Sequence, residues 1–561
     1  MRRLLSISTM AAVLAAAALA GAPGSTAAAP ASPAPASPAP GSAAAPVSPA
    51  APTGDLVTLS EQVAALDPGT GDDDLGALEG TPSLPTGDVT LLKQRQEAIR
   101  PQPSAADRTV TVPIGRYYMS SAVMQPVAVG TRGYEDTKVW PRGGWGTRDS
   151  TGVRMFIWPG TTKQWNHPVG QAQYAIHNLN SYRLTKDPVY LETARKSAQR
   201  LVDRRVVSAG AWYYPYDFNF SVHGDTTQML TAPWYSAMAQ GQALSAFVRM
   251  FEATKDPKWR LAADATFLSL LQAPYSTAPF SSRVDTNGRL WFEEYPRYPI
   301  ANSEMVLNGH IFAMYGLHDY WQLTKDDNAR KLFLGGLSTI ERSVLTEYRR
   351  PSWLSVYSLR HQMNTHSYHP IHIGQFLVLW RLTKDNRWIE AATAFRNDYP
   401  TQAQTGQLRI TPKVRTIYKI SSTGGIASSR TVSFARLTGA PYDRRQRLQG
   451  GPIAYRVTAG AYAGWWFPEA YGVAWGLGAI DRHGYFPETP VMFRGGTTFT
   501  AYRLDSAGNV AGSRTLTISS TRVSGAPTRY SGVVLGRPSY YFYSGAFAGY
   551  WVPLQYKVYL P

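Results

Sequence analysis

The chain of 561 residues contains no cysteine. This absence excludes disulfide bonds, thiolate metal sites and a cysteine nucleophile. Beyond its first residues the sequence also lacks an uninterrupted apolar run of membrane length, so we expect no membrane span in the mature protein. A chain of this length can still bury a large core without disulfides, and it has room for two or three domains.

Acidic residues are few. There are 38 Asp and Glu against 56 Lys and Arg, which gives a net charge of +18. The basic side chains are scattered and match no nucleic-acid motif, so we expect no nucleic-acid partner. Anionic cell-wall polymers and acidic polysaccharides remain as partners. General solubility and wall adhesion explain the charge equally well.

The N-terminus is typical of export. Met1-Arg2-Arg3 precedes an Ala/Leu-rich stretch, and we interpret residues 1–28 as a secretory signal peptide, which predicts a secreted protein. Residues 29–107 begin with a run of Ala, Pro, Ser and Gly and form a predicted disordered linker. Residues 108–165 are rich in Tyr, Trp, Gly and β-branched residues, which predicts a short β-rich segment capping the next domain.

Residues 166–405 carry an internal repeat. Thr-Lys-Asp occurs four times, at spacings of 69, 70 and 59 residues, beginning at Thr185, Thr254, Thr324 and Thr383. Each copy follows an apolar helical pattern and precedes an amphipathic one, and its Asp can cap the second helix. Helix hairpins at this period must stack, either as an open solenoid or as a closed ring. The very apolar first helices favour closure, so we predict a mainly α domain, an (α/α) toroid or barrel of helix hairpins.

A second repeat follows residue 410. Gly460-Ala461-Tyr462-Ala463-Gly464-Trp465-Trp466 matches Gly545-Ala546-Phe547-Ala548-Gly549-Tyr550-Trp551, 85 residues later. Together with strand and turn signals, this predicts two tandem small β modules, at residues 410–485 and 486–561. Their aromatic side chains could stack on cell-wall glycan, although aromatic cores explain them at least as well.

Several motifs in register link the helical segment to a known family. They are Trp234 to Gln242, Glu293-Glu294-Tyr295-Pro296, Val306-Leu307-Asn308-Gly309, Tyr357-Ser358-Leu359-Arg360-His361 and Tyr368-His369. Over about residues 166–400 the chain resembles the catalytic domain of the D-glucuronyl C5-epimerase family. The resemblance implies an (α/α) barrel with tyrosines and a glutamate at the reacting centre. Ser358, Ser367 and His310 stand where the family commonly has Asp, Asp and an aromatic residue.

The resemblance also implies roles for single residues. The implied catalytic residues are Glu294, Tyr295, Tyr357 and Tyr368, and Arg360 is the implied ligand of the substrate carboxylate. Further candidates for substrate binding are Asn308, Gln240, Trp234 and His372.

These residue types suit the inversion of C5 in a uronic acid. Two acid/base groups must flank the ring, and a cation or proton donor must neutralise the charge that develops beside the carboxylate. Arg360 has a planar fork that matches a carboxylate. A tyrosine has an ordinary pKa of about 10, so it acts as a base only beside positive charge, which Arg360 and nearby histidines could supply. We expect Tyr368 on one face of the sugar and Glu294 or Tyr295 on the other.

The sequence thus favours a secreted C5-epimerase acting on D-glucuronic acid residues within an acidic polysaccharide. A polysaccharide lyase using the same proton abstraction and a non-catalytic cell-wall glycan-binding protein are the alternatives. We expect no cofactor and no metal, because Pro370 and the lack of a nearby carboxylate argue against zinc at His366, His369 and His372. The oligomeric state stays open.

Overall fold

The structure is a computed structural model. The predicted signal peptide (1–28) and linker (29–107) lie outside the residues it describes, which are 108–134, 138–158, 161–222, 226–364, 367–399, 403–410, 412–422, 424–436, 438–469, 474–479, 491–493, 495–505, 510–523, 528–534, 537–542, 544–553 and 558–559. No helix among these residues is long and apolar enough to cross a membrane.

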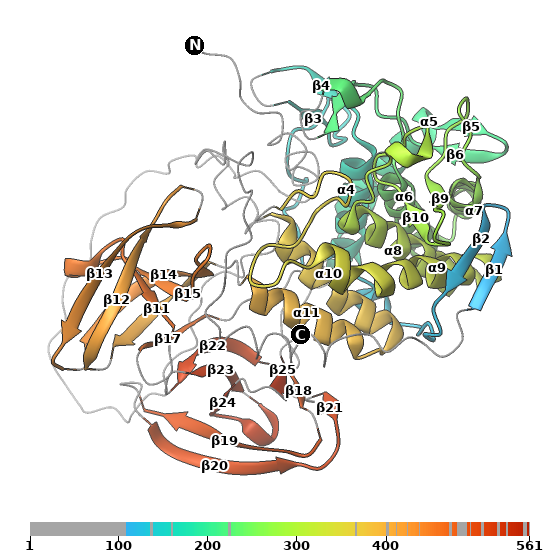
Figure 1. Cartoon of the computed structure of the whole chain (residues 1–561). Coiled ribbons are helices and arrows are strands. Elements are labelled where there is room, and N and C mark those ends of the chain that lie inside the picture. Colours follow the sequence, from blue (N-terminus) through green and yellow to red (C-terminus); the bar gives the residue numbers. More distant parts are fainter. Residues whose placement is uncertain are drawn as a thin grey trace, which may run out of the picture.

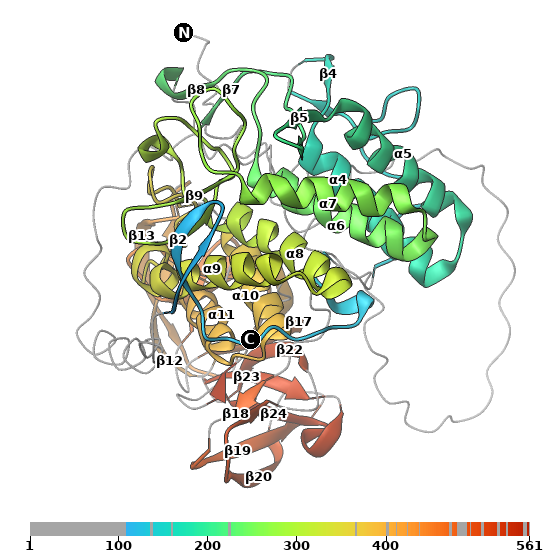
Figure 2. The ribbon, with the colours of Figure 1, turned by 90° about the vertical axis from the view of Figure 1, so that its right-hand side faces the viewer.

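Helical hairpins build the larger part of the molecule, as the first repeat predicts (Figures 1 and 2). The first helix of each hairpin is largely buried; these inner helices are α4 (Pro168–Thr185), α6 (Ala237–Thr254), α8 (Leu307–Thr324) and α10 (Tyr368–Thr383). The second helices lie outside them and are α5 (Pro188–Arg204), α7 (Pro257–Leu271), α9 (Asp327–Ser343) and α11 (Arg387–Asp398). The inner helices pack against one another in chain order.

The Thr-Lys-Asp turns explain why each hairpin forms. In all four turns the lysine is left-handed, with φ between 57° and 61°, which ends the inner helix. The threonine hydroxyl accepts the Asp N–H at 3.1 to 3.3 Å. The Asp carboxylate then accepts an N–H from the start of the outer helix at 2.8 to 3.0 Å. One tripeptide therefore stops one helix and caps the next.

Glycines bring two inner helices into backbone contact. A Cβ added at Gly241 of α6 would lie 2.3 Å from the Cα of Ala313 on α8, and one at Gly316 would lie 2.1 Å from the carbonyl oxygen of Gly241. No larger residue fits at either position without separating the helices.

Residues 125–134 cross the C-terminal ends of the inner helices. Gln125 N–H donates to the Leu382 carbonyl at 2.8 Å, and Asn180 Nδ2 donates to the Tyr134 carbonyl at 3.2 Å. Arg132 pairs with Glu252 at 2.9 Å. This segment thus contacts α10, α4 and α6, and it covers the base of the helical domain.

Short β-hairpins decorate the helices. The first, β1 (Arg108–Val112) with β2 (Gly115–Met119), packs on α9. The others are β3 (Phe156–Ile157) with β4 (Gln164–Trp165), β5 (Val206–Ser208) with β6 (Ala211–Tyr213), β7 (Phe220–Ser221) with β8 (Met229–Leu230), and β9 (Ser282–Val284) with β10 (Leu290–Phe292). Short irregular turns of helix are η1 (Val129–Thr131), η3 (Thr226–Gln228), η4 (Ile300–Asn302), η5 (Val344–Tyr348), η6 (Gly460–Tyr462) and η7 (Gly545–Phe547).

The C-terminal region forms one hydrogen-bonded sheet of 12 strands. The order β13-β12-β16-β15-β14 is repeated in the second half as β20-β19-β24-β23-β22, with β11 and β17 between the halves. These strands are β11 (Ala403–Ile410), β12 (Lys413–Ile420), β13 (Ile426–Phe434), β14 (Thr438–Arg447), β15 (Ile453–Val457), β16 (Trp466–Pro468), β17 (Ala474–Ala479), β19 (Thr497–Leu504), β20 (Val510–Ile518), β22 (Thr528–Val534), β23 (Arg537–Phe542) and β24 (Tyr550–Pro553). A three-stranded sheet adds β18 (Met492–Phe493), β21 (Arg522–Val523) and β25 (Val558–Tyr559).

The second sequence repeat corresponds to this repeated strand order. Tyr418 pairs with Trp466 in the first half, and Tyr502 pairs with Trp551 in the second. Each half also has its own apolar core. The halves are therefore structural copies that share a sheet.

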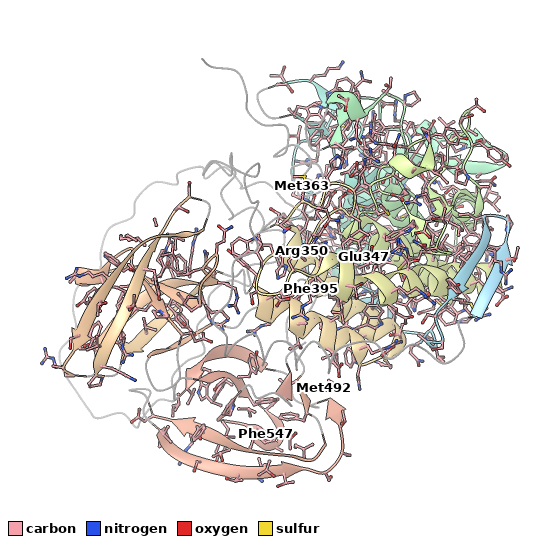
Figure 3. All side chains as sticks on the ribbon, viewed as in Figure 1. Glu347, Arg350, Met363, Phe395, Met492 and Phe547 are labelled. Atoms are coloured by element: carbon pink, nitrogen blue, oxygen red, sulfur yellow. The ribbon has the colours of Figure 1, made fainter. Side chains whose placement is uncertain are left out.

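The second half packs on the last outer helix. Arg396 of α11 donates to the Tyr540 hydroxyl at 2.8 Å, and Ile389 packs on Met492. Figure 3 shows Met492 between Phe395 of the helical domain and Phe547 of the second β half.

Candidate active site

A small pocket lies where the inner helices begin. Its lining residues are His167, Val169, Tyr216, Trp234, Ser236, Met238, Glu294 and Tyr295. The enclosed space is about 10 Å³, roughly what one water molecule needs. His167 and Ser236 are the residues before α4 and α6, so the pocket is at the end of the domain opposite residues 125–134.

The structure brings the four implied catalytic residues together. The hydroxyl of Tyr357 donates to Glu294 Oε1 at 3.2 Å, and the Tyr295 hydroxyl lies 3.2 Å from the Tyr357 hydroxyl. The ring of Tyr368, the first residue of α10, lies 4.4 Å from the ring of Tyr357. The two hydroxyl groups and the carboxyl group of Glu294 form one hydrogen-bonded cluster.

Helix α8 supplies the other contact of Glu294. Asn308 Nδ2 donates to Glu294 Oε2 at 3.4 Å. At the next position a Cβ would lie 2.3 Å from the same oxygen, so only glycine, as Gly309, leaves room for the carboxylate. The Asn308-Gly309 pair at the start of α8 therefore provides both a hydrogen bond and the space that the Glu294 carboxylate needs.

Glu294 is held as a weak acid. Its side chain is buried, with 4% of the residue exposed, and no described Lys or Arg forms an ion pair with it. Burial raises its pKa to about 7, although hydrogen bonds from Tyr295, Tyr357 and Asn308 lower it in part. A carboxyl group with this pKa can both take and give a proton near neutral pH.

The pKa values of two tyrosines are raised, which disfavours the phenolate form that we expected. Burial, followed by the charge of Glu294, raises the pKa of both Tyr295 and Tyr357 well above 10. The positive field that we expected from Arg360 and the histidines is not among the causes. For Tyr295 and Tyr357 the charge of Glu294 acts in the opposite sense, while a phenolate at Tyr368 stays a prediction. Both tyrosines are neutral hydrogen-bond donors at neutral pH.

The adjacent Glu293 has a different environment. Arg283 Nε donates to its Oε1 at 2.7 Å, and the N–H of Met305 donates to its Oε2 at 3.0 Å. Both charged partners are buried. Glu293 therefore ties the β9–β10 hairpin to the segment before α8 and does not contact the tyrosines.

Arg360 lies at the rim, where it joins two surface segments. Its Nε donates to Gln228 Oε1 at 3.0 Å, and its Nη1 donates to the Ala301 carbonyl at 3.1 Å and to Asn302 Oδ1 at 3.3 Å. All these acceptors are neutral. Arg360 contacts none of the pocket carboxylates among the described residues, and its role toward a substrate stays a prediction.

Of the other predicted binding residues, Trp234 lines the pocket and the rest do not. Trp234 stacks on Tyr216 at 3.8 Å between ring centroids. Gln240 uses its amide within the fold, accepting from Tyr214 N–H and donating to the Trp212 carbonyl and Ser269 Oγ. His372 Nδ1 lies 2.8 Å from Ser355 Oγ, and burial lowers its pKa well below 6.5. Neither Gln240 nor His372 touches Glu294, so their binding roles stay predictions.

Ser358 is explained by a carboxylate that the motifs did not reveal. Its hydroxyl donates to the buried Glu304 Oε2 at 2.8 Å, and His361 Nδ1 lies 2.7 Å from the same oxygen. An aspartate at Ser358 would place a second negative charge against Glu304. In this chain Glu304 therefore already supplies a carboxylate beside Ser358 and His361.

Two histidines of the cluster considered for zinc, His369 and His372, make hydrogen bonds within the fold. The third, His366, lies outside the described residues. His369 Nδ1 accepts the Ser355 N–H at 2.9 Å, and its Nε2 donates to the Phe395 carbonyl at 2.9 Å. Within the part of the chain that the structure describes, no three His, Asp or Glu residues are placed to hold a metal ion.

Comparison with known proteins points to the same family as the sequence motifs. Residues 208–397 match the family model described as D-glucuronyl C5-epimerase C-terminus. The D-glucuronyl C5-epimerase of Caenorhabditis elegans is 28% identical over 190 residues, which are 30% of this chain and 29% of the worm protein. An uncharacterized protein of Methanocaldococcus jannaschii is 25% identical over 189 residues, 34% of this chain and 58% of the archaeal protein. The chain thus spans less than two thirds of either relative.

Among solved structures, cellobiose 2-epimerase from Bacillus thermoamylovorans aligns with a TM-score of 0.33 and 10% identity, over 55% of this chain and 86% of that one. Unsaturated glucuronyl hydrolase from Streptococcus agalactiae aligns with a TM-score of 0.28 and 14% identity, over 41% and 57%. From the family match and the worm relative, residues 208–397 are similar to the C-terminal domain of the D-glucuronyl C5-epimerase family.

Proposed function

We propose that this protein is a secreted uronate C5-epimerase that inverts C5 of D-glucuronic acid residues within an acidic polysaccharide. The observation that carries the proposal is the buried, uncompensated Glu294 in a hydrogen-bonded cluster with two tyrosines, inside the segment that matches the epimerase family. In the same proposal, the helix hairpins close into an (α/α) toroid with this site at one rim.

Glu294 is the proposed base. With a pKa of about 7 it is partly ionised at neutral pH and is basic enough to accept a proton from carbon that a carboxylate flanks. The neutral phenols cannot serve as bases at this pH, because their pKa values are raised. These pKa values support Glu294 over Tyr295 as the base.

A tyrosine is the proposed acid. Inversion needs a proton on the opposite face of C5, and we keep Tyr368 for this role, since Tyr357 is engaged with Glu294. The inner-helix N-termini around the pocket add partial positive charge, which favours a carboxylate substrate and the charge that develops on it.

Arg360 is the proposed gate and carboxylate ligand. The pocket has room for about one water molecule, so we propose that the rim segments separate when a sugar ring enters. The present acceptors of Arg360 are amide and carbonyl oxygens, and a carboxylate forms stronger, two-point hydrogen bonds with a guanidinium group. When the polymer binds, Arg360 would thus give up its weaker hydrogen bonds to neutral oxygens and form a stronger one to the substrate carboxylate.

The β halves are the proposed attachment to acidic or cell-wall glycan. Trp466 and Trp551 are buried, in line with the aromatic-core interpretation, whereas their neighbours Trp465 and Tyr550 are partly exposed. Lys419 Nζ lies 5.4 Å from the ring centroid of Trp465. A partly exposed ring beside a cation suits an acidic sugar.

The test is incubation of the chain with a panel of uronic acid polymers in deuterium oxide. We expect deuterium at C5 and iduronate-type stereochemistry without chain cleavage. An unsaturated product that absorbs in the ultraviolet would identify a lyase instead. Binding without exchange on any glucuronan would contradict the epimerase and support a glycan-binding protein.

A further inference from the structure

One pocket residue comes from outside the segment that matches the epimerase family. His167 lines the same pocket as Glu294 and Tyr295, yet it precedes residues 208–397. It is the N-cap of α4, and its Nδ1 accepts the N–H of Gly170 at 3.0 Å. The residue is 5% exposed.

The hydrogen bonds of His167 fix where its proton lies. Because Nδ1 accepts a hydrogen bond, the one hydrogen of the neutral ring is on Nε2. Burial, together with the charge of Arg154, lowers the pKa of His167 to about 3, so the ring is neutral at neutral pH. Nε2 has no hydrogen-bond partner among the described residues. His167 therefore offers an unused N–H donor in a pocket that contains the proposed base.

Neighbouring rings hold this donor in place. The ring of Tyr216 is perpendicular to that of His167, with centroids 5.1 Å apart, and the ring of Phe156 is 5.4 Å away. A donor that is already oriented stabilises developing charge without a reorganisation cost. Because no side chain or backbone group among the described residues accepts from Nε2, the N–H is available to a ligand.

We propose that His167 Nε2–H donates a hydrogen bond to a carboxylate oxygen of the bound uronate. This rests on the proposed epimerase function. Glu294 takes the proton from C5, and the electron pair of that bond moves into the C5–C6 bond, which places a second negative charge on the carboxylate oxygens. His167 stabilises that charge while keeping its own proton. The pair then returns to C5 as a tyrosine hydroxyl delivers a proton to the other face.

A neutral donor suits this step. Imidazole held neutral at a helix N-terminus can polarise a substrate oxygen as an electrophile. Arg360 contacts only the rim, whereas His167 lines the pocket itself. Its place before α4 means that the matched segment alone lacks a full site.

His167→Asn separates the two roles of this residue. Asparagine is a good N-cap, so its side chain can still accept the Gly170 N–H. Its amide is too short to replace Nε2 as a donor. We expect the melting midpoint to stay near that of the parent chain, while kcat for C5 exchange falls about 10² to 10³-fold, as for the loss of one oxyanion donor. The deuterium isotope effect at C5 should increase, because proton abstraction becomes slower relative to other steps.

Asp256→Ala is the matched control. Asp256 caps the outer helix α7 by accepting the Lys258 N–H at 3.0 Å, so this variant loses a cap without touching the pocket. We expect a lower melting midpoint and unchanged exchange. His167→Ala should lose both stability and kcat.

The outcomes separate the two proposals. Parent-like kcat and isotope effect in His167→Asn would overturn the role of His167 while leaving the epimerase function intact. Absence of exchange by the parent chain on every uronic acid polymer would overturn the epimerase function, and with it the donor role.

Discussion

Three buried glutamates lie within a short stretch of the chain, and the partners of their carboxylates differ. Glu293 is paired with the buried Arg283, and Glu304 accepts a hydrogen bond from Ser358 and lies beside His361. Glu294 has phenol and amide donors only. The first two carboxylates hold segments together. The third is left with a pKa of about 7, which is useful to proton transfer and costly to folding.

The largest effect should come from removing the uncompensated carboxylate. Glu294→Gln keeps the shape and an acceptor for Tyr357 but removes the base. We expect C5 exchange to fall by about 10³-fold or more, in the range for loss of a general base. Exchange measured by mass spectrometry on the best polymer checks this. Retention of more than a tenth of the rate would mean that another group takes the proton.

Breaking the compensated pair should affect folding instead. Glu293→Gln leaves Arg283 buried without its counter-ion, and we expect a loss of about 3 kcal/mol in the free energy of unfolding. Chemical denaturation measures it. The folded fraction should retain exchange activity far better than Glu294→Gln does. Equal loss of specific activity in the two variants would contradict the division of roles.

The same contrast predicts a pH effect on stability. The pKa of Glu294 is raised from 4.5 to about 7 on folding, so between these values the folded chain binds more protons than the unfolded chain. Stability should therefore fall as pH rises through this window, by about 3 kcal/mol for this group. The loss of stability is absent below the pKa of 4.5 in the unfolded chain and complete above the pKa of about 7 in the folded chain.

Glu294→Gln provides the control for this pH effect. The variant should be more stable than the parent above neutral pH, and the difference should vanish in acid. Unfolding curves measured across the window, for both proteins, test the sign. A variant that is less stable at every pH would show that Glu294 is compensated after all.

The part of the fold that the sequence predicts is the part set by local chemistry. Thr-Lys-Asp turns stop one helix and cap the next within a few residues, so the four hairpins follow from the repeat. The shared sheet of the β halves does not, because β11 and β17 join them through long-range strand pairing that leaves no local pattern.

The site divides in the same way. The motifs predict the set of Glu294, Tyr295, Tyr357 and Tyr368, and the structure brings them together. Neighbouring residues after a strand point to opposite sides, so the Glu293-Glu294 pair predicts different surroundings for the two carboxylates without saying which one meets the tyrosines. The rim contacts of Arg360 come from residues 228 and 301–302, which no periodicity connects to it.

The smallest effect concerns the rim cluster. Ser358→Asp introduces the residue that the family commonly has, but here it would face Glu304 across the present 2.8 Å hydrogen bond. Like charges in a buried site disfavour ionisation, so one carboxyl group must stay protonated or the contact must open. We expect a loss of about 1 to 2 kcal/mol near neutral pH, in the range for a lost buried hydrogen bond, and a smaller loss in acid.

Combining this change with Glu304→Gln tests the replacement of one acid by the other. The double variant has a single carboxylate beside His361, as the parent has, so stability should recover toward the parent value. Recovery measured by a double-mutant cycle would show that Glu304 supplies the acid that Ser358 does not. Additive losses would instead mean that positions 358 and 304 act independently. Ser358, Glu304 and His361 would then not form one interacting cluster.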